Sequence, residues 1–435
     1  MNFEDYFPQF INYTANVGDV KLVGVKPTSP CLICRGGKRL CGKAVCPLVV
    51  KAASLAKYHS MIESNLVDGS TPPGVFVGQV GYPKVSVGPM IPPFHGDTHI
   101  LDSPEEWLGK SIDEIIDLRY SLIRGKKRAH ITDALSSSTI QTFQELAMAE
   151  KPVESEALFK KKPDKTLFLS EFSQPFGPSA PLEEFTTANI DVDSRIEKAY
   201  YDRDLKAAPA IIGLYERGVT VTRIQRCLSV GMFGIQENRK LVPTRWSITA
   251  VDDTLSKRIV EEIKDYPTID EYRVYKFSYL DNLYVVILIP LGWEFEWIEA
   301  WFPGTTWNMN GISPTLIGDH EGYRGRTTYA EVGGCYYSTR LAISERLLKE
   351  RKQAGVLALR EIHPGYTLPV GVWNVRESIR KTMKQRPCVF DTFTHALTYA
   401  LKGFIIPLKN WISNSVLLRK MLYQRRLDSY KGDRV

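Results

Sequence analysis

The sequence predicts an α+β protein with more than one domain, and three observations support this class. The chain has 435 residues, well above the roughly 100–150 residues that are typical of one domain. Its residues are 43% hydrophobic and 24% charged, which fits an ordinary globular protein and excludes a disordered, collagenous or coiled-coil chain. Strand-like runs are concentrated in the middle of the chain, and helix-like patterns precede and follow them.

We expect three regions in order along the chain. Residues 1–68 predict a small, basic module with four cysteines, residues 69–307 a central α+β region with antiparallel strands, and residues 308–435 a mostly helical region. The segment around residues 151–165 is polar and mixed, which predicts an exposed connection.

Individual elements follow from periodicity and capping residues. Ser103 and Pro104 predict a helix start, and helical spacing continues to residue 124. Two more helices are predicted at 193–218 and 220–230, one at 338–353 and one at 370–384. The β-branched and aromatic runs at 272–279 and 283–289 flank Asp281 and Asn282, which predicts a hairpin.

Nothing in the sequence indicates a membrane protein. No apolar run approaches the roughly 20 residues that span a bilayer. The first five residues, Met-Asn-Phe-Glu-Asp, lack the basic and apolar regions of a secretory signal. We therefore expect a cytoplasmic protein that makes no membrane contact.

The basic charge is concentrated near the start of the chain. Although the net charge is only +7, residues 20–62 contain eight basic side chains and no acidic one. These are Lys21, Lys26, Arg35, Lys38, Arg39, Lys43, Lys51 and Lys57. The rest of the chain holds 48 basic and 49 acidic side chains. This local excess predicts an anionic partner at one place.

Four of the seven cysteines lie in the same stretch. Cys31, Cys34, Cys41 and Cys46 have the spacing C-x2-C-x6-C-x4-C. Because disulfides are disfavoured in a reducing compartment, this cluster predicts a structural Zn²⁺ held by four thiolates. An iron–sulfur cluster or four thiols without metal are the alternatives.

The residues between the cysteines favour nucleic-acid binding. Arg35, Lys38, Arg39 and Lys43 would present positive charge to a phosphate backbone, so DNA is the expected partner. The alternative is a module in which zinc only folds the N-terminus. Further along, Trp293, Phe295, Trp297, Trp301 and Trp307 are either a base-stacking platform or core residues.

The predicted helix at 370–384 carries a second basic pattern. Trp373, Arg376, Arg380 and Lys384 form one stripe beside an apolar stripe. This face is typical of a helix that follows a phosphate backbone, or of a solvated face with a tryptophan at its rim.

Common catalytic motifs are absent, but several reactive residue types remain as candidates. The sequence has no phosphate-binding loop G-x-x-x-x-G-K-[ST], no H-E-x-x-H and no G-x-S-x-G. Asp252 and Asp253 are candidate ligands of a divalent ion, although only one of them would face a site if they lay on a strand. His363, before Pro364, is a candidate general acid or base.

Other residues complete these candidates. Arg245 and Arg376 are candidates for clamping a phosphate. Tyr366 and Glu377 lie close to His363 and Arg376 in the sequence and are candidate site residues as well. All of them could equally form buried salt bridges and loop caps. Whether the protein is an enzyme that acts on nucleotide or DNA-end phosphodiesters is left open by these residues.

Several longer segments resemble one family. The basic four-cysteine motif, residues 242–255 (VPTRWSITAVDDTL) and residues 362–377 (IHPGYTLPVGVWNVRE) are similar to the archaeal Nre family of DNA repair proteins. Residues 78–93, with Gly81-Tyr82-Pro83-Lys84-Val85, fit as well. The resemblance covers residues 31–380 and implies a role in the DNA-damage response, with an N-terminal and a smaller C-terminal family region.

The resemblance also implies a C-terminal peptide that docks on the sliding clamp, PCNA. Gln424, Leu427 and Tyr430 match the pattern of such peptides, while Lys431 stands where a second aromatic residue is usual. One helical turn would bring Leu427 and Tyr430 to the same side. The alternative is the last turn of a basic amphipathic helix that starts near Asn410.

Three functions are therefore expected in order of preference. The first is a DNA repair factor that binds DNA with the zinc module and is recruited by the clamp. The second is an enzyme that uses Asp252, His363 and the two arginines on phosphodiesters. The third is an adaptor without enzymatic activity, in which the zinc is purely structural.

Overall fold

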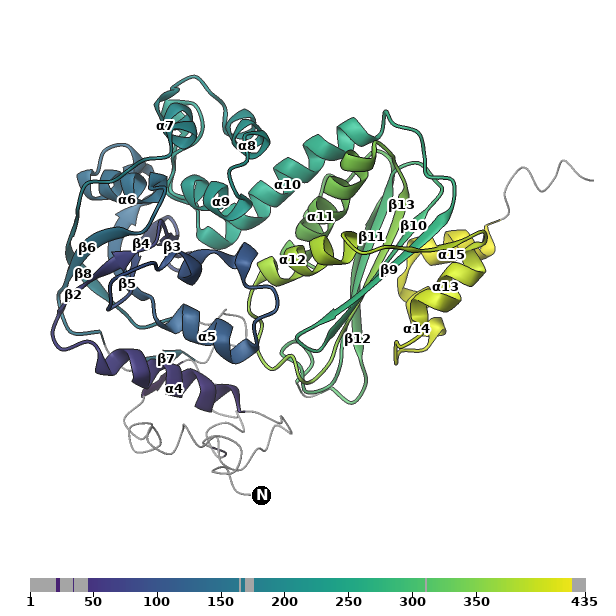
Figure 1. The fold of residues 1–435 in the computed structure, drawn as a ribbon, viewed down its shortest axis with the longest axis horizontal. Coiled ribbons are helices and arrows are strands. Elements are labelled where there is room, and N and C mark those ends of the chain that lie inside the picture. The colour runs from purple at the N-terminus through teal and green to yellow at the C-terminus, as the bar shows by residue number, and fades with distance from the viewer. Residues whose placement is uncertain are drawn as a thin grey trace, which may run out of the picture. The chain divides into compact units, whose positions relative to one another are not determined.

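The computed structural model describes residues 21–23, 34, 46–163, 166–168, 176–309 and 311–424. The chain divides into two compact units, of which the first comprises residues 1–255 and 367–374 and the second residues 256–366 and 375–435. Each unit contains its own mixed β-sheet with helices around it, as Figure 1 shows. The predicted α+β class is therefore confirmed. Most of the predicted cysteine motif lies outside the described residues.

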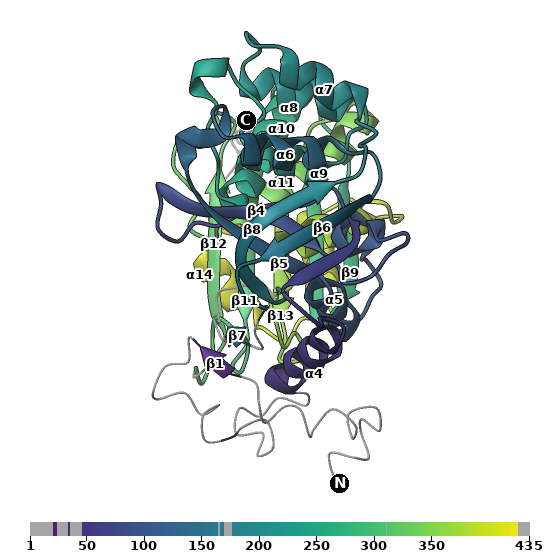
Figure 2. The same cartoon turned by 90° about the vertical axis from the view of Figure 1, so that its left-hand side faces the viewer.

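The first unit is built on a six-stranded sheet in the order β2-β6-β8-β5-β4-β3. Its neighbours run antiparallel, except that β5 and β8 are parallel. The strands are β2 (Leu66–Thr71), β3 (Val75–Val77), β4 (Lys84–Ile91), β5 (Ile123–His130), β6 (Val153–Phe159) and β8 (Ser179–Thr187). Figure 2 looks toward this sheet. A separate parallel pair joins β1 (Lys21–Val23) and β7 (Thr166–Phe168).

Helices precede, separate and follow the strands of this sheet in the chain. Among the described residues of the first unit they are α4 (Pro47–Ser60), α5 (Ile112–Tyr120), α6 (Ser138–Met148), α7 (Ser194–Tyr201), α8 (Ala207–Glu216), α9 (Val221–Ser229) and the first part of α10 (Thr244–Ile263). The same residues also form 3-10 segments at His99–Asp102, Pro104–Glu106, Ile131–Ala134 and Gln236–Asn238. Within the described residues, no helix is both long enough and apolar enough to cross a membrane.

Three predicted elements of this unit were wrong. Where one helix was expected from Ser103 to residue 124, the structure has a 3-10 turn at Pro104–Glu106 and then the separate helix α5. Ser111 is the N-cap of α5 and forms a reciprocal capping box with Glu114. The helix expected at 193–218 is two helices, because the Asp202 carboxylate accepts hydrogen bonds from the backbone of Asp204 and Leu205 and makes a turn.

The third correction concerns the expected connection at 151–165, which contains strand β6. Its side chains alternate between buried positions such as Val153 and Ala157 and exposed positions such as Glu154 and Glu156. The glutamates made the segment look like a loop, but one face of this antiparallel edge region is open to water. The period of two was the informative signal.

The second unit is built on a sheet in the order β12-β11-β13-β10-β9-β14. Its strands are β9 (Tyr272–Tyr279), β10 (Asn282–Ile289), β11 (Glu294–Trp301), β12 (Thr315–Glu321), β13 (Gly355–Ile362) and β14 (Cys388–Phe390). Only β11 and β13 are parallel neighbours. The predicted hairpin is confirmed, although its two turn residues are Leu280 and Asp281, both with positive φ, and Asn282 already pairs in β10.

Helices cover both faces of this second sheet, as Figure 1 shows. One face packs on α13 (Phe393–Leu401), α14 (Leu408–Asn414) and α15 (Val416–Tyr423) through an apolar cluster that includes Ile287, Ile298, Leu359, Trp411 and Leu417. The other face lies under α11 (Gly334–Glu350). The helix α12 (Val372–Met383) confirms the one predicted at 370–384.

Several expectations for the second half of the chain change. The region 308–435 is rich in helices, as expected, but it also supplies β12, β13 and β14 to the sheet. The helix expected at 338–353 starts earlier, at Gly334, and ends at Arg351, whose φ of 52° is left-handed. The helix expected from Asn410 is split at Ser415, whose hydroxyl caps α15.

The aromatic run between residues 293 and 307 is mostly core. Trp293, Phe295, Trp297 and Trp301 are at most 4% exposed, and only Trp307 is exposed, at 39%. The base-stacking interpretation is therefore wrong for the four buried rings. These four rings are buried because helices cover both faces of this sheet, so side chains on either face are mostly apolar.

The helix α10 was not expected from the sequence, although its pattern contains a clear signal. Val251, Leu255, Ile259 and Ile263 are buried and recur every fourth residue. The polar residues between them, which include the adjacent Asp252 and Asp253, concealed this stripe. These two aspartates therefore lie on a helix and not on a strand.

One aspartate holds several elements of the first unit together. Asp193 caps α7 and binds Arg195 (2.6 Å) and Arg223 (2.8 Å), and its side chain is 1% exposed. Arg223 also donates to the carbonyls of Met148 and Ala149 at the end of α6. The hydrogen bond from Arg195 is the main reason that the pKa of Asp193 falls from 3.8 to about 2.

We expect Asp193→Asn to lower the free energy of unfolding at neutral pH by about 2 kcal/mol. Asparagine caps a helix as well as aspartate does, so the substitution removes mainly the charge. The lowered pKa means that the stabilisation is present above about pH 4 and is lost as the pH falls through about 2. Urea unfolding at several pH values should therefore show the two proteins converging in acid. The exposed Asp191→Asn is the control, and a constant difference across this range would contradict the prediction.

Candidate functional site

Only two of the four predicted zinc ligands lie within the described residues. Cys34 is buried, Cys46 is partly exposed, and both are thiols. Cys31 and Cys41, like the predicted DNA contacts Arg35, Lys38, Arg39 and Lys43, lie outside the described residues. Cys46, the last cysteine of the motif, has an extended backbone and is the N-cap residue of α4. The helix begins at the next residue, Pro47, a favourable first position for proline.

The helix α4 accounts for part of the N-terminal charge. Lys51 is only 4% exposed, and Lys57 forms an ion pair with Asp117 of α5 at 2.7 Å. Tyr58 donates a hydrogen bond to the same carboxylate. Val50, Leu55 and Tyr58 pack with Ile116 and Tyr120, which fixes α4 against α5. The exposed positive surface expected from residues 20–62 is therefore smaller than the sequence suggested.

The two predicted aspartates of the middle motif lie in different environments on α10. Asp252 is fully buried and accepts a hydrogen bond from Gln225 Nε2 at 3.0 Å, whereas Asp253 is partly exposed. A buried, amide-bonded carboxylate of this kind links α10 to α9 and is poorly placed to bind an incoming metal ion. Arg245, about two helical turns earlier than Asp252, is exposed.

His363 lies in a closed environment after β13. Its ring stacks on Phe302 at 4.4 Å, its Nε2 lies 3.2 Å from Glu361 Oε2, and its side chain is 13% exposed. Glu361 also accepts hydrogen bonds from the backbone of Ile405 and Ile406. His363 belongs to the second unit and Asp252 to the first, so neither unit by itself contains the predicted catalytic pair.

Tyr366 lies beside a buried charged cluster at the carboxyl ends of β11 and β13. Arg360 donates to Glu299 Oε1 at 2.8 Å and twice to Asn282 Oδ1, and its guanidinium lies over the rings of Tyr284, Trp301 and Tyr366. Arg360 and Glu299 side chains are at most 3% exposed. This cluster was not predicted, because its members are far apart in the sequence.

Cys335 lies next to this cluster at the start of α11. Although the residue as a whole is partly exposed, burial of its thiol raises the pKa well above the ordinary value, and the Glu299 carboxylate raises it further. A thiol with a raised pKa is a poor nucleophile and a poor metal ligand. Through Arg360, the cluster links β13 to Glu299 of β11 and to Asn282 of β10.

The predicted basic stripe of α12 is largely buried. Arg376 has a side-chain exposure of 1% and contacts Glu377 at 3.2 Å. Arg380 binds Glu377 at 2.9 Å and Glu345 of α11 at 2.5 Å. Trp373, at the start of α12, is 5% exposed and packs edge-on against Trp107. The interpretation of this stripe as an exposed phosphate-binding face is wrong for Trp373 and Arg376, and Arg380 is neutralised by two carboxylates.

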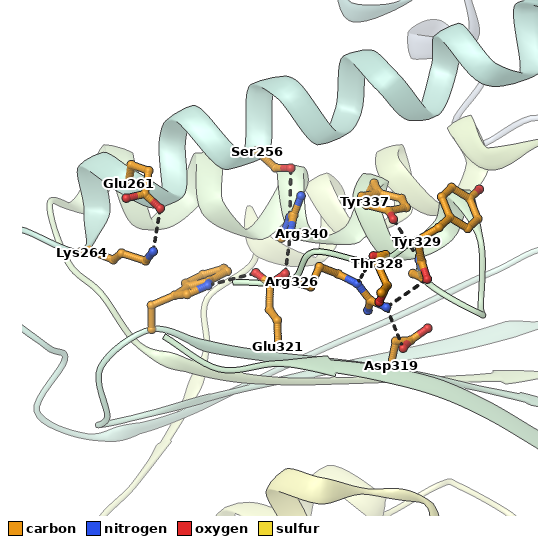
Figure 3. Close-up of polar contacts among 12 residues, drawn as sticks. Ser256, Glu261, Lys264, Asp319, Glu321, Arg326, Thr328, Tyr329, Tyr337 and Arg340 are labelled. Carbon is orange, nitrogen blue, oxygen red and sulfur yellow. Dashed lines mark hydrogen bonds and ion pairs between the residues drawn. The ribbon is translucent and has the colours of Figure 1, made fainter. Parts of the chain in front are cut away.

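A second polar network joins β12 to α10 and α11, and Figure 3 shows it in close-up. Arg340 of α11 donates to Glu321 Oε2 at 2.7 Å and to Ser256 Oγ at 3.0 Å, while Trp293 donates to Glu321 Oε1. Arg326 lies beside it and binds Asp319 at 3.1 Å. These charges balance one another inside the unit, which is typical of a structural network.

The described residues contain no group of three or more His, Cys, Asp or Glu side chains placed to hold a metal ion. The buried acids instead face arginines or backbone N–H groups, as the Arg360 cluster, the Arg340 network and Glu361 show. Of the predicted catalytic residues, Asp252, His363 and Glu377 make internal contacts, whereas Asp253 is partly exposed.

We expect Arg360→Met to lower the free energy of unfolding by about 3–5 kcal/mol, because Glu299 would stay buried without its partner. The double variant Glu299→Gln/Arg360→Met should lose less than the single variant, since neither charge then remains. Urea denaturation of both variants measures the difference. Equal losses in the two proteins would show that the ion pair is not what fixes this part of the sheet.

Comparison with known proteins places the chain in a family. The family described as Archaeal Nre, N-terminal matches residues 40–308, and Archaeal Nre, C-terminal matches residues 321–430. No solved structure matches the chain.

Three curated relatives are similar over most of their length. The DNA repair protein NreB of Archaeoglobus fulgidus is 46% identical over 391 residues, which cover 90% of this chain and 97% of the relative. The DNA repair protein NreA of the same organism is 40% identical over 85% of this chain and 92% of the relative. The DNA repair protein NreA of Haloferax volcanii is 36% identical over 78% of this chain and 84% of the relative. Both family regions and these near full-length identities show that the chain belongs to the archaeal Nre family.

Proposed function

We propose that this chain is a DNA repair protein, that it binds DNA through its basic four-cysteine module, and that the sliding clamp PCNA recruits it. The observation that carries the repair role is its 46% and 40% identity to two DNA repair proteins over at least 92% of their lengths. A protein that handles DNA needs access to it, so we also propose a cytoplasmic location.

The chemistry of the N-terminal segment supports zinc and DNA as ligands. Cys31, Cys34, Cys41 and Cys46 would hold one Zn²⁺, which cross-links the segment through four thiolates. Because α4 starts directly after Cys46 and packs on α5, a folded module would be attached to the first unit by a short connection.

Six of the eight cations remain for DNA once the internal contacts of α4 are considered, and four of them lie inside the cysteine motif. Lys51 is buried and Lys57 is paired with Asp117, whereas Arg35, Lys38, Arg39 and Lys43 lie between the proposed ligands with no acidic residue near them in the sequence. Charges of one sign on a small folded loop favour contact with phosphates and a strong dependence on salt.

We expect Lys38→Glu/Arg39→Glu/Lys43→Glu to weaken DNA binding and to lower the slope of log K against log salt by about 0.9 for each lost phosphate contact. Fluorescence anisotropy with a duplex at several salt concentrations measures both. The matched control is the triple variant of the exposed Lys349, Lys381 and Lys409. Elemental analysis should find one zinc per chain, lost in Cys41→Ser. Binding that is unchanged in the module variant, or purified protein without stoichiometric metal, would contradict this proposal.

The C-terminal tail is the proposed clamp ligand. Gln424 is exposed and directly follows α15, while Leu427 and Tyr430 lie outside the described residues. Gln424 would act as the polar latch, and the two apolar side chains would fill a pocket of the clamp.

We expect Leu427→Ala/Tyr430→Ala to abolish capture by immobilised clamp, because the variant removes both apolar anchors. The control is Tyr423→Ala, which changes an aromatic residue of 69% exposure just before the proposed peptide. Lys431→Phe should tighten binding about tenfold or more, since it restores the second aromatic anchor. Capture that is equal in all four proteins would exclude the tail as the clamp ligand.

A further inference from the structure

Two aromatic side chains of the first unit are paired on its surface. Tyr82 is 48% exposed and Trp246 is 47% exposed, and their ring centroids lie 5.1 Å apart at an angle of 49°. They are far apart in the sequence and come from a loop and a helix. Large aromatic rings usually fill protein cores, as Trp293, Phe295, Trp297 and Trp301 do in this chain. An exposed aromatic pair is therefore a candidate binding surface.

The loop that carries Tyr82 has a defined conformation. It joins β3 to β4 and is closed by hydrogen bonds from Gly78 N to Ser86 O (2.7 Å) and from Lys84 N to Gly81 O (2.9 Å). Gly81 has a φ of 86°, and a Cβ there would meet the guanidinium of Arg128 at 2.8 Å. Glycine is therefore required for the turn and for the close approach of Arg128.

The helix start that carries Trp246 is fixed to the same strand. Thr244 Oγ1 accepts a hydrogen bond from Val77 N at the end of β3, at 2.8 Å, and lies 3.0 Å from Ser229 Oγ. Val242 N donates to Ser229 O at 2.8 Å. The loop and the first turn of α10 are thus tied to one another, and both rings are held in place without being buried.

Basic residues outnumber acidic ones in the segments that carry the pair and the adjacent strand. Residues 69–96, 118–132 and 238–251 contain no Asp or Glu, although acidic residues such as Asp133 and Glu237 lie next to their ends in the sequence. Their basic residues are Lys84, Arg119, Arg124, Lys126, Lys127, Arg128, Arg239, Lys240 and Arg245. Of these, Lys84, Arg128, Lys240 and Arg245 are exposed. Lys84 is the first residue of β4, Arg128 lies on the adjacent strand β5, and Arg245 lies in the first turn of α10. Arg128 Nη1 lies 3.5 Å from Val80 O, directly beside the loop.

We propose that Tyr82 and Trp246 form a stacking platform for an unpaired base of single-stranded DNA, and that Lys84, Arg128 and Arg245 contact its phosphates. Aromatic faces bind any base whose own face is free, and cations beside them follow the backbone. In a duplex each base is already stacked on its neighbours, so this surface selects single-stranded DNA. The inference rests on the proposed DNA-binding function, but it uses a surface other than the cysteine module.

The platform is tested by measuring binding of the full chain to an oligothymidylate and to a hairpin duplex by fluorescence anisotropy. Tyr82→Ala/Trp246→Ala should weaken binding of the oligothymidylate about 5- to 150-fold, the range for the loss of one stacked base. Duplex binding should change little. Arg245→Glu, which keeps both rings, should lower the salt slope for the oligothymidylate by about 0.7.

The matched control is Tyr201→Ala in the same unit. Tyr201 is 66% exposed and its ring lies 5.1 Å from that of Tyr200, but Asp202 and Asp204 flank it. It should bind both DNAs as the wild type does. Thermal melting checks that all variants are folded, and Trp246→Phe, which keeps an aromatic face, should retain most of the affinity.

The outcomes separate this inference from the proposed function. If the wild type binds DNA and the cysteine-module variant is impaired, but Tyr82→Ala/Trp246→Ala behaves like Tyr201→Ala, the platform is excluded and the function stands. Equal losses for oligothymidylate and duplex would also exclude stacking. A wild type that binds neither DNA would overturn both proposals. Selective loss of oligothymidylate binding supports the platform.

Discussion

The second unit depends on one constraint, which is that acidic side chains inside its sheet must be paired. Glu296, Glu299, Glu321 and Glu361 lie on β11, β12 and β13 and are at most 3% exposed. A buried charge without a partner costs several kcal/mol, so each needs a fixed donor. Glu321 binds Arg340 of α11 and Glu299 binds Arg360, while Glu361 accepts from the backbone before α14 and Glu296 from the start of α15. The helices are thereby fixed on the sheet at defined positions.

This constraint changes how the reactive residues of the sequence are understood. His363, Glu377 and Arg376 are residue types that are common in active sites. In this structure His363 contacts Glu361, and Arg376 contacts Glu377, within a packed interior. Asp252 is similar in the first unit, where Gln225 satisfies it. Charges that are paired in this way stabilise the fold, and only exposed cations are available to a polyanion. In the first unit Lys84, Arg128 and Arg245 are exposed cations.

The family regions and the compact units do not coincide. The N-terminal family region ends at residue 308 and the C-terminal one begins at 321, whereas the units divide inside α10 and α12. The strands β9, β10 and β11 of the first family region pair with β13 and β14 of the second in a single sheet. The two regions must therefore fold together. Sequence similarity alone cannot show this, because a linear match does not reveal which strands pair.

The sequence by itself determined the α+β class, the β9–β10 hairpin, α12 and the family, because these depend on local periodicity, turn residues and long ordered motifs. Only the tertiary structure decided which charged and aromatic residues are buried. Trp297 and Trp246 are the same type of residue, but one lies in a sheet covered on both faces and the other at an exposed helix start. Burial depends on which distant segments pack together, and a single sequence does not specify those contacts residue by residue.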